Sequence, residues 1–168
     1  MNILFLTVSR ITDINLSGIY TDLMRHFRDK GHHVYIVSPF ERRLNQKTKL
    51  IENDGIKLLN VRTLNIEKAN LIEKGIGTLL LENQYHQAIQ KYLQKIKFDL
   101  VLYSTPPITT VSVVKYIKQR DGAKAYLMLK DIFPQNAVDL GMIKKNGMIH
   151  RYFRNEEKKL WICTSHDE

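Results

Sequence analysis

The chain has 168 residues and carries 26 Lys and Arg residues against 17 Asp and Glu residues, a formal net charge of +9 at pH 7. With 43% hydrophobic residues it has the length and composition of one folded domain, which excludes a disordered chain. The basic balance is typical of an ordinary solvated surface or of one that attracts an anionic membrane, and no arginine-rich tract or recognised motif supports nucleic acid as a partner.

The beginning of the chain predicts a strand, a helix and a second strand. A near-continuous apolar run predicts a strand over residues 2–8 that is covered on both faces. We expect the helix to begin at Ser17, whose side-chain oxygen would cap the first turn, and to end at Gly31 in a left-handed conformation. The second strand covers residues 33–37 and stops at Pro39. The helical residues that would face the sheet are Ile19, Tyr20, Leu23, Met24 and Phe27.

The middle of the chain predicts a basic segment, a strand and a long helix. Residues 40–53 are polar and basic, and we interpret them as a loop or an irregular segment. Asp54-Gly55 indicates a turn that leads into a third strand over residues 56–61. A helix over about residues 78–96 follows. Its apolar stripe consists of Leu81, Tyr85, Ala88, Ile89, Tyr92 and Ile96.

The last part of the chain alternates strands and helices again. The pattern predicts a strand over residues 100–103, a helix over 109–119, a strand over 125–129 and a final helix over 148–161. Apolar runs that alternate with helical patterns indicate βαβ units, whose crossovers are right-handed. We therefore predict an α/β fold, a Rossmann-like and doubly wound open sheet of about five mostly parallel strands with helices on both faces.

The final helix is predicted to be amphipathic. Its apolar side would pack on the sheet and leave the basic side in solvent, which is the interpretation that we favour. A basic amphipathic helix can instead lie on an anionic membrane surface. The apolar residues are Ile149, Tyr152, Phe153 and Leu160, and the basic residues are Arg151, Arg154 and Lys158.

Three loops leave the carboxyl ends of predicted strands, where open parallel sheets bind their ligands. They cover residues 9–18, 104–109 and 130–136, and we expect them to converge on one crevice. In the first loop, Ser17-Gly18 opens a helix. This pair either binds an anion near exposed backbone amides or simply caps the helix.

The other two loops each allow a functional and a structural interpretation. Pro106-Pro107 stiffens its loop, and it either shapes a pocket wall or only ends the strand before it. Asp131 lies just beyond a predicted strand. Its carboxylate either acts as a general base toward a substrate hydroxyl or caps a helix that starts at Ile132.

Several common chemical motifs do not occur in the sequence. No G-x-G-x-x-G follows the first strand and no G-x-x-x-x-G-K-[ST] is present, which weighs against a dinucleotide or P-loop site. No two histidines share a helix face at metal-ligand spacing, and there is no G-x-S-x-G nucleophile elbow. We therefore expect neither a cofactor nor a metal in this chain.

The chain also predicts where the protein works. The single cysteine, Cys163, excludes an intrachain disulfide and fits a reducing compartment. No apolar run approaches the ~20 residues that cross a bilayer, and the apolar start, residues 1–7, is too short for a signal-peptide core. We predict a cytoplasmic protein, with any membrane contact peripheral and on the inner face of the cell membrane.

Two stretches of the sequence carry a family resemblance. The first reads MNILFLT and, after a loop, SGIYTDLMRHFRDKGHHVYIVSP. The second reads STPPITT, then LKDIFPQNAVDLGMI and IHRYFRNEEKKLW. Together they resemble the amino-terminal domain of family 4 glycosyltransferases, and the second is similar to the subgroup that builds bacterial capsule, O-antigen or exopolysaccharide units. That subgroup usually has Arg-Asp where this chain has Lys130-Asp131.

This resemblance implies a GT-B fold, in which two Rossmann-like domains face a cleft. The amino-terminal half would bind a glycan acceptor, often a lipid-linked sugar, and the carboxyl-terminal half a nucleotide-sugar, usually without a metal. Ser17 and Gly18 match the small-residue turn at the cleft, and Asp131 matches the acidic residue that we nominate as catalytic. The residues that match the acceptor-binding loop after the fourth strand are Thr105, Pro106 and Pro107.

The resemblance also implies a domain organisation. We expect residues 1–161 to form the acceptor-binding domain, whereas residues 162–168 do not resemble the continuation of the family. The nucleotide-sugar domain with its E-x7-E signature is not found in the chain, so we predict that these 168 residues transfer no sugar alone. An exposed interdomain face would favour homo-oligomers. The alternatives are a stand-alone Rossmann-like binding module or partner subunit without catalysis of its own, and a nucleotide-dependent enzyme of another type, which the missing glycine fingerprint disfavours.

Overall fold

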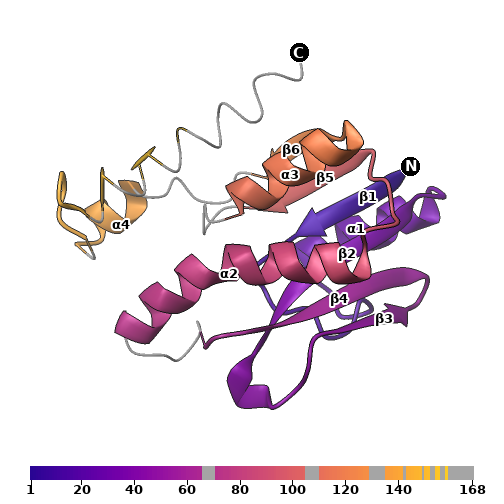
Figure 1. Ribbon diagram of the computed structural model, residues 1–168, viewed down its shortest axis with the longest axis horizontal. Coiled ribbons are helices and arrows are strands. Elements are labelled where there is room, and N and C mark those ends of the chain that lie inside the picture. The colour runs from indigo at the N-terminus through magenta and orange to yellow at the C-terminus, as the bar shows by residue number, and fades with distance from the viewer. Residues whose placement is uncertain are drawn as a thin grey trace.

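One six-stranded sheet with helices packed against it organises the computed structural model (Figure 1). The structure describes residues 1–65, 71–104, 110–128, 135–141, 143–148, 150, 151, 154, 155 and 158. The strands are β1 (Asn2–Leu6), β2 (His33–Glu41), β3 (Lys49–Asn53), β4 (Ile56–Thr63), β5 (Leu100–Ser104) and β6 (Lys124–Met128). The helices are α1 (Ile19–Asp29), the short 3₁₀ helix η1 (Arg42–Leu44), α2 (Leu71–Tyr92), α3 (Val111–Asp121) and α4 (Gln135–Asp139).

Five of the six strands in the described part of the chain run parallel. The strand order is β3-β4-β2-β1-β5-β6, and β3 pairs antiparallel with β4 at one edge. Leu6 of β1 is in register with Val37 of β2 on one side and with Tyr103 of β5 on the other. The chain thus builds the sheet outward from β1, first toward β4 and then, after α2, toward β6. The prediction of an α/β fold with a mostly parallel sheet is confirmed.

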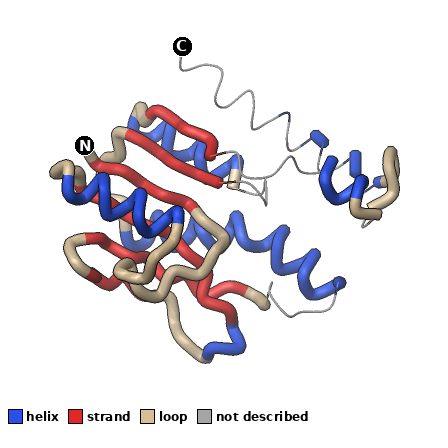
Figure 2. The backbone as a smooth tube through the Cα atoms, turned by 180° about the vertical axis from the view of Figure 1, so that it is seen from behind, coloured by secondary structure: helices blue, strands red, loops and turns tan. Residues whose placement is uncertain are grey.

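Side chains of β1 enter two separate apolar clusters. Leu4 belongs to a cluster with Tyr85 of α2 and Ile117 of α3, whereas Phe5 belongs to a cluster with Met24 of α1. Figures 1 and 2 show α2 and α3 on one side of the sheet and α1 on the other. Because successive residues of a strand point to opposite faces, β1 needs apolar side chains at each buried position, from Ile3 to Leu6. This explains its continuous apolar sequence.

The first helix begins later than predicted. α1 starts at Ile19 with Gly18 at its cap position, and no side chain caps it, so the prediction that Ser17 caps the helix is wrong. Instead, the hydroxyl of Thr21 donates to the carbonyls of Leu16 at 2.6 Å and Gly18 at 3.0 Å. These hydrogen bonds join the first turn of the helix to the loop before it. Ile19 was expected to face the sheet, but its side chain is 76% exposed.

The other end of α1 follows the prediction. Gly31 has a φ of +82°, and the N–H of His32 donates to the carbonyl of Phe27 at 3.1 Å. This is the left-handed ending that glycine permits. Met24 is fully buried, as expected. The partly buried α1 side chains that pack on the same cluster are Tyr20, Leu23 and Phe27.

The second strand continues through Pro39 to Glu41, so the prediction that it stops at Pro39 is wrong. The carbonyl of Val37 accepts from the N–H of Thr7 at 3.1 Å, and residues two apart on a parallel strand aim their backbone groups at the same neighbour. The nitrogen of Pro39, which carries no hydrogen to donate, therefore faces the end of β1. There the carbonyl of Thr7 accepts from Tyr85 Oη at 2.6 Å instead. The proline is tolerated because no acceptor is left unpaired.

Residues 40–53, expected to be a loop, contain the edge strand β3. It pairs with β4 so that Asn53 lies opposite Ile56. Between them, Asp54 and Gly55 have φ angles of 49° and 73°, the left-handed conformations that a two-residue hairpin requires. The predicted turn is confirmed. The polar residues before it form a strand because they pair with β4, which their own sequence did not indicate.

The long helix α2 begins and ends earlier than predicted, at Leu71 and Tyr92. Gly75 and Gly77 lie inside it, and because glycine lowers helix propensity, the sequence suggested a later start. The remaining strands and α3 agree with their predicted bounds within two residues. The predicted helix over residues 148–161 lies mostly outside the described residues. The buried members of the predicted α2 stripe are Leu81, Tyr85, Ala88 and Ile89.

Candidate functional site

The growth of the sheet reverses between β1 and β5, and open parallel sheets bind ligands at the carboxyl ends of the strands beside such a switch point. The loop after β1, residues 7–18, borders this place and is fully described. Two predicted site residues, Ser17 and Gly18, belong to it. The expected convergence of this loop with the loops after β5 and β6 stays a prediction. The predicted site residues that lie outside the described residues are Thr105, Pro106, Pro107 and Asp131.

Hydrogen bonds and two buried isoleucines hold the loop after β1 in place. Ile11 and Ile14 are buried in the cluster beneath α1. The N–H of Ile14 donates to Asn53 Oδ1 at 3.0 Å, and its carbonyl accepts from Arg25 Nη1 at 2.7 Å. The loop is therefore tied to both the hairpin and α1. A loop fixed in this way loses little conformational freedom when a ligand binds.

A small pocket of about 220 Å³ lies between this loop and the start of α1, and we call it the loop pocket. Ser17 and Gly18 are both exposed and both line it. Ser9, Thr12, Asp13 and Arg10 add two hydroxyls, a carboxylate and a guanidinium to its wall. Hydroxyls donate and accept hydrogen bonds and a carboxylate accepts them, so the wall can bind a ligand with several hydroxyl groups.

The start of α1 already holds a carboxylate. Asp22 Oδ1 accepts from the N–H of Gly18 at 3.3 Å and from Arg25 Nη2 at 2.6 Å. An aspartate in the first turn stabilises the positive end of the helix dipole, so a second anion gains less there. Of the two interpretations of Ser17-Gly18, anion binding loses support. A neutral polar ligand remains compatible with this charge distribution.

Buried polar side chains that the sequence did not reveal lie in the carboxyl-terminal halves of β2 and β4. Ser38 Oγ donates to Asn60 Oδ1 at 3.1 Å. Glu41 is only 5% exposed and accepts from Arg43 Nε at 2.5 Å. Thr63 lies opposite Glu41 in the strand register, and its hydroxyl is buried without a hydrogen-bond partner in the structure. The sequence did not indicate that these side chains are buried in strands, because β2 was expected to stop at Pro39.

The position of Glu41 bears on the dinucleotide alternative. In dinucleotide-binding sheets of this strand order, an acidic residue after the second parallel strand binds the ribose hydroxyls. Glu41 stands at the end of that strand, but it is buried and paired with Arg43. The loop after β1 also has no glycine fingerprint. The arrangement does not favour a dinucleotide site.

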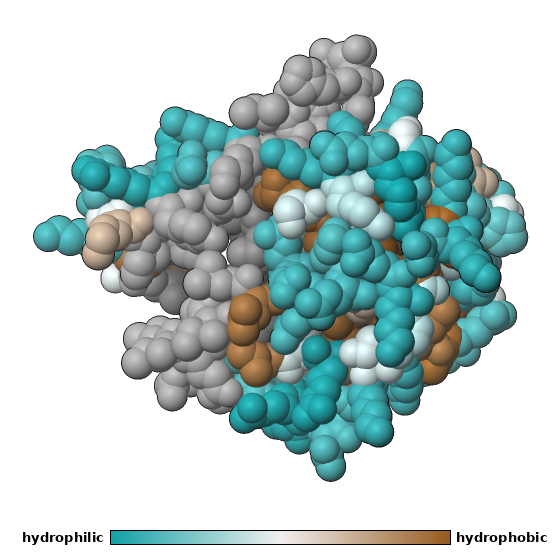
Figure 3. Space-filling model, viewed as in Figure 1, coloured by the Kyte–Doolittle hydropathy of each residue, from teal (hydrophilic) through white to brown (hydrophobic). Residues whose placement is uncertain are grey.

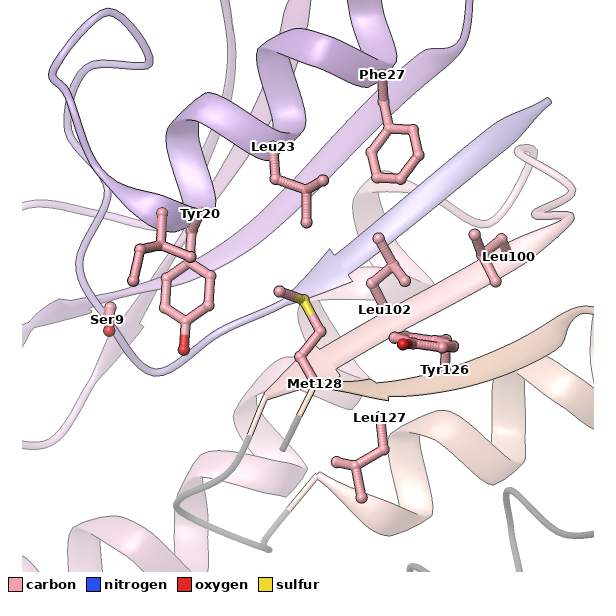
Figure 4. Close-up of a pocket in the computed structure, with 10 residues that line it drawn as sticks. Ser9, Tyr20, Leu23, Phe27, Leu100, Leu102, Tyr126, Leu127 and Met128 are labelled. Carbon is pink, nitrogen blue, oxygen red and sulfur yellow. The ribbon is translucent and has the colours of Figure 1, made fainter. Parts of the chain in front are cut away.

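A larger apolar groove of about 1060 Å³ separates α1 from β5 and β6 (Figure 4). In Figure 4, Leu23 and Phe27 of α1 and Met128 of β6 point into this space. Ser9, Ile19 and Tyr20 line both the apolar groove and the loop pocket, so the two cavities share a wall. The other residues that line the apolar groove are Leu100, Leu102, Tyr126 and Leu127.

Tyr85 reaches the same end of β1 from the opposite side of the sheet. Its hydroxyl donates to the carbonyl of Thr7, and burial raises the pKa of Tyr85 well above its ordinary value of 10.0. It therefore stays protonated near neutral pH and serves as a structural donor. The face of the molecule that α2 and α3 cover is largely hydrophilic (Figure 3).

Two further findings concern the described residues alone. They contain no group of three His, Cys, Asp or Glu side chains that could hold a metal ion. None of their helices combines the length and the apolar character needed to cross a bilayer.

No protein-family model matches the chain, and the search of curated proteins finds no significant match. The glycosyltransferase resemblance therefore stays a prediction from the motifs. The candidate site rests on the loop pocket and on the switch point beside it.

Proposed function

We propose that this chain is the acceptor-side half of a GT-B glycosyltransferase, a doubly wound Rossmann-like domain that binds a lipid-linked glycan. The whole enzyme would transfer a sugar from a nucleotide-sugar to this acceptor in the synthesis of a bacterial surface polysaccharide. The observation that carries the proposal is the loop pocket, which presents hydroxyls, a guanidinium and a carboxylate among apolar side chains and lies beside the switch point of the sheet.

The start of α1, at one end of the loop pocket, favours a glycan over a phosphate. Asp22 already accepts from the amide of Gly18 at the start of α1. The hydroxyls of Ser9, Thr12 and Ser17 line the pocket and can exchange hydrogen bonds with sugar hydroxyls. An acceptor glycan would find these partners without displacing a structural ion pair.

The roles of the other site residues follow from the motif resemblance. Asp131 would act as a general base that takes the proton of the acceptor hydroxyl as the new glycosidic bond forms and the nucleotide diphosphate leaves. The second wall of the acceptor site would consist of Thr105, Pro106 and Pro107. The nucleotide-sugar would bind to another domain, and the protein would work at the cytoplasmic face of the membrane.

Saturation-transfer NMR tests the proposal with sugars carried on short-chain lipid diphosphates and, separately, with free nucleotide-sugars. We expect saturation transfer to at least one lipid-linked sugar and none to the nucleotide-sugars. Ser17→Tyr should fill the loop pocket and remove the signal, because Ser17 is exposed and lines this pocket. Ser112→Tyr, on the exposed surface of α3, is the matched control and should keep it. The proposal fails if no lipid-linked sugar responds, or if Ser17→Tyr leaves the response unchanged.

A further inference from the structure

A second polar cavity lies between β4 and α2 (Figure 1). It has a volume of about 200 Å³, and we call it the basic pocket. It shares no lining residue with the loop pocket, and the described residues that line it include no acid. The polar residues of its wall are Thr48, Arg62, Gln84, Gln87, Lys91 and Tyr92.

Two side chains of the basic pocket carry a positive charge without a counter-ion. In the described part of the chain, neither Arg62 nor Lys91 forms an ion pair. The exposed lysines Lys47 and Lys49 flank Thr48 in the sequence and add to the positive charge on this side. Cations that line a cavity without acidic neighbours raise the local concentration of anions. The basic pocket therefore favours an anionic ligand.

The wall of the basic pocket also holds a fixed hydroxyl. The carbonyl of Thr48 accepts from Tyr92 Oη at 3.0 Å, and Thr48 Oγ1 accepts from the N–H of Arg62 at 2.9 Å. These bonds hold Thr48 from both α2 and β4. Among the described residues, the hydroxyl hydrogen of Thr48 has no acceptor. Phosphate oxygens accept from guanidinium, ammonium and hydroxyl groups alike, so the wall offers three kinds of donor to one phosphate.

Gln84 adds a second requirement to the ligand. Its Oε1 atom is buried, and in the described part of the chain it has no hydrogen-bond partner. A buried acceptor is stabilised by a donor, which a fully ionised phosphate lacks and a hydroxyl supplies. The volume of the basic pocket equals that of roughly seven water molecules, which is enough for a phosphate and a short hydroxylated chain.

We propose that the basic pocket binds a phosphate ester with a neighbouring hydroxyl, of which glycerol phosphate is the simplest example. Arg62, Lys91 and Thr48 bind the phosphate, and Gln84 Oε1 accepts from the hydroxyl. The same group occurs as a free metabolite and as the headgroup of an anionic glycerol lipid. The inference goes beyond the proposed glycan acceptor and does not depend on it, because the two pockets have no residue in common.

Two-dimensional NMR with glycerol phosphate and methyl phosphate tests the role of Gln84. We expect both esters to shift the amide resonances around Arg62 and Lys91, and glycerol phosphate to bind severalfold more tightly. Gln84→Leu should remove this preference, because it removes the acceptor for the hydroxyl. Gln90→Leu, at an exposed position of α2, is the matched control and should keep it. The spectra also show whether each variant keeps the fold.

Lys91→Gln and Lys95→Gln separate a specific site from the attraction of a basic surface. Both lysines are exposed and both changes remove one charge, but only Lys91 lines the basic pocket. We expect Lys91→Gln to weaken the binding of glycerol phosphate about tenfold, and Lys95→Gln to have little effect. A preference for glycerol phosphate that survives Gln84→Leu overturns the assignment of the hydroxyl.

Vesicles distinguish the two sources of the phosphate ester. The two lysine variants are compared in titrations with soluble glycerol phosphate and in co-sedimentation with vesicles that contain phosphatidylglycerol. A difference between the variants with the soluble ester assigns a free ligand, whereas a difference with vesicles alone assigns a lipid headgroup. If neither experiment distinguishes Lys91→Gln from Lys95→Gln, the inference is overturned.

Discussion

At the scale of single residues, Tyr85 donates a hydrogen bond to a backbone carbonyl just after β1. Its hydroxyl donates to the carbonyl of Thr7 at 2.6 Å, and Pro39 has no N–H that could take its place. We predict that Tyr85→Phe lowers the free energy of unfolding by about 1–3 kcal/mol, the cost of leaving a buried acceptor unsatisfied. Urea denaturation followed by circular dichroism measures this loss.

Tyr92→Phe is the matched control for this prediction. Tyr92 Oη donates to the carbonyl of Thr48 at 3.0 Å, but the site is only partly buried, so water can replace the lost donor. We expect Tyr92→Phe to lower the free energy of unfolding by at most about 1.5 kcal/mol. Equal losses for the two tyrosines would show that the Thr7 carbonyl finds another partner.

Asp121 gives the stability of the fold a dependence on acid pH. Burial raises the pKa of Asp121, but the hydrogen bonds from Arg120 and from the N–H of Phe98 outweigh it and hold the pKa below its ordinary value of 3.8. The carboxylate therefore stabilises the folded state above pH 3.8, and this contribution is lost as the pH falls through the lower folded value. We predict that Asp121→Asn lowers the free energy of unfolding at neutral pH. It should also make this free energy fall less steeply at acid pH, the part of the curve that we call the acid limb.

Urea denaturation at a series of pH values from neutral to about pH 2 checks this prediction. Asp139→Asn, on the exposed surface of α4, is the control and should keep the acid limb of the parent protein. If Asp121→Asn instead shows the same acid limb as the parent, another group carries the pH dependence.

At the scale of elements, the β3–β4 hairpin depends on its left-handed glycine. Gly55 has a φ of +73°, and among the described residues a Cβ added there would meet only the Arg28 side chain, at ordinary contact distances of 3.4 Å to Cδ and 3.8 Å to Cγ. The cost of Gly55→Ala is therefore conformational, and we predict a loss of about 1–2 kcal/mol in the free energy of unfolding. Gly55→Asn should lose less, because asparagine tolerates this conformation better.

Gly31→Ala provides the comparison for the hairpin, measured in the same urea titrations. Gly31 has a φ of +82° with no atom within 4 Å of an added Cβ, so it isolates the conformational cost at the end of α1. A loss similar to that of Gly55→Ala is expected. A much larger loss at Gly55, or no rescue by asparagine, would point to the contact with Arg28 instead.

The elements that the sequence predicted correctly are those whose own residues decide their structure. β1 and β5 are continuous apolar runs, and the buried stripe of α2 has a clear helical period. The wrong predictions concern residues whose structure is decided by a neighbouring strand. β3 is a strand because β4 pairs with it, and Pro39 stays in β2 because β1 ends beside it. No local pattern contains that information.

At the scale of the whole molecule, the candidate site also contains residues that the local sequence predicts and residues that depend on the assembled sheet. Ser17 and Gly18 were predicted because they follow the first strand directly, and they do line a pocket. Glu41 and Thr63 were not, because their burial depends on strand register. The apolar groove was not foreseen either. It lies between α1 and the strands β5 and β6, and in the described part of the chain only the assembled layers reveal it.

The net charge of +9 predicts that the molecule binds anionic membranes. Each Lys or Arg near such a surface contributes about 1 kcal/mol, and salt shortens the reach of this attraction from about 10 Å at 0.1 M to about 3 Å at 1 M. In liposome co-sedimentation we expect binding to vesicles with anionic lipid at low salt, release at high salt, and no binding to neutral vesicles. Equal binding to both kinds of vesicle would contradict an electrostatic attachment.

Where the charge sits decides how strongly the molecule attaches. If residues 148–161 form the predicted amphipathic helix, Arg151, Arg154 and Lys158 stand together on its basic side, and neutralising all three to glutamine should weaken anionic vesicle binding severalfold. The control neutralises three other exposed lysines, Lys95, Lys97 and Lys115, with the same change in net charge. A larger effect of the first set means that the predicted basic helix carries the membrane-facing charge. Equal effects mean that the attraction belongs to the net charge of the whole molecule, because a diffuse field does not distinguish between two sets of the same size.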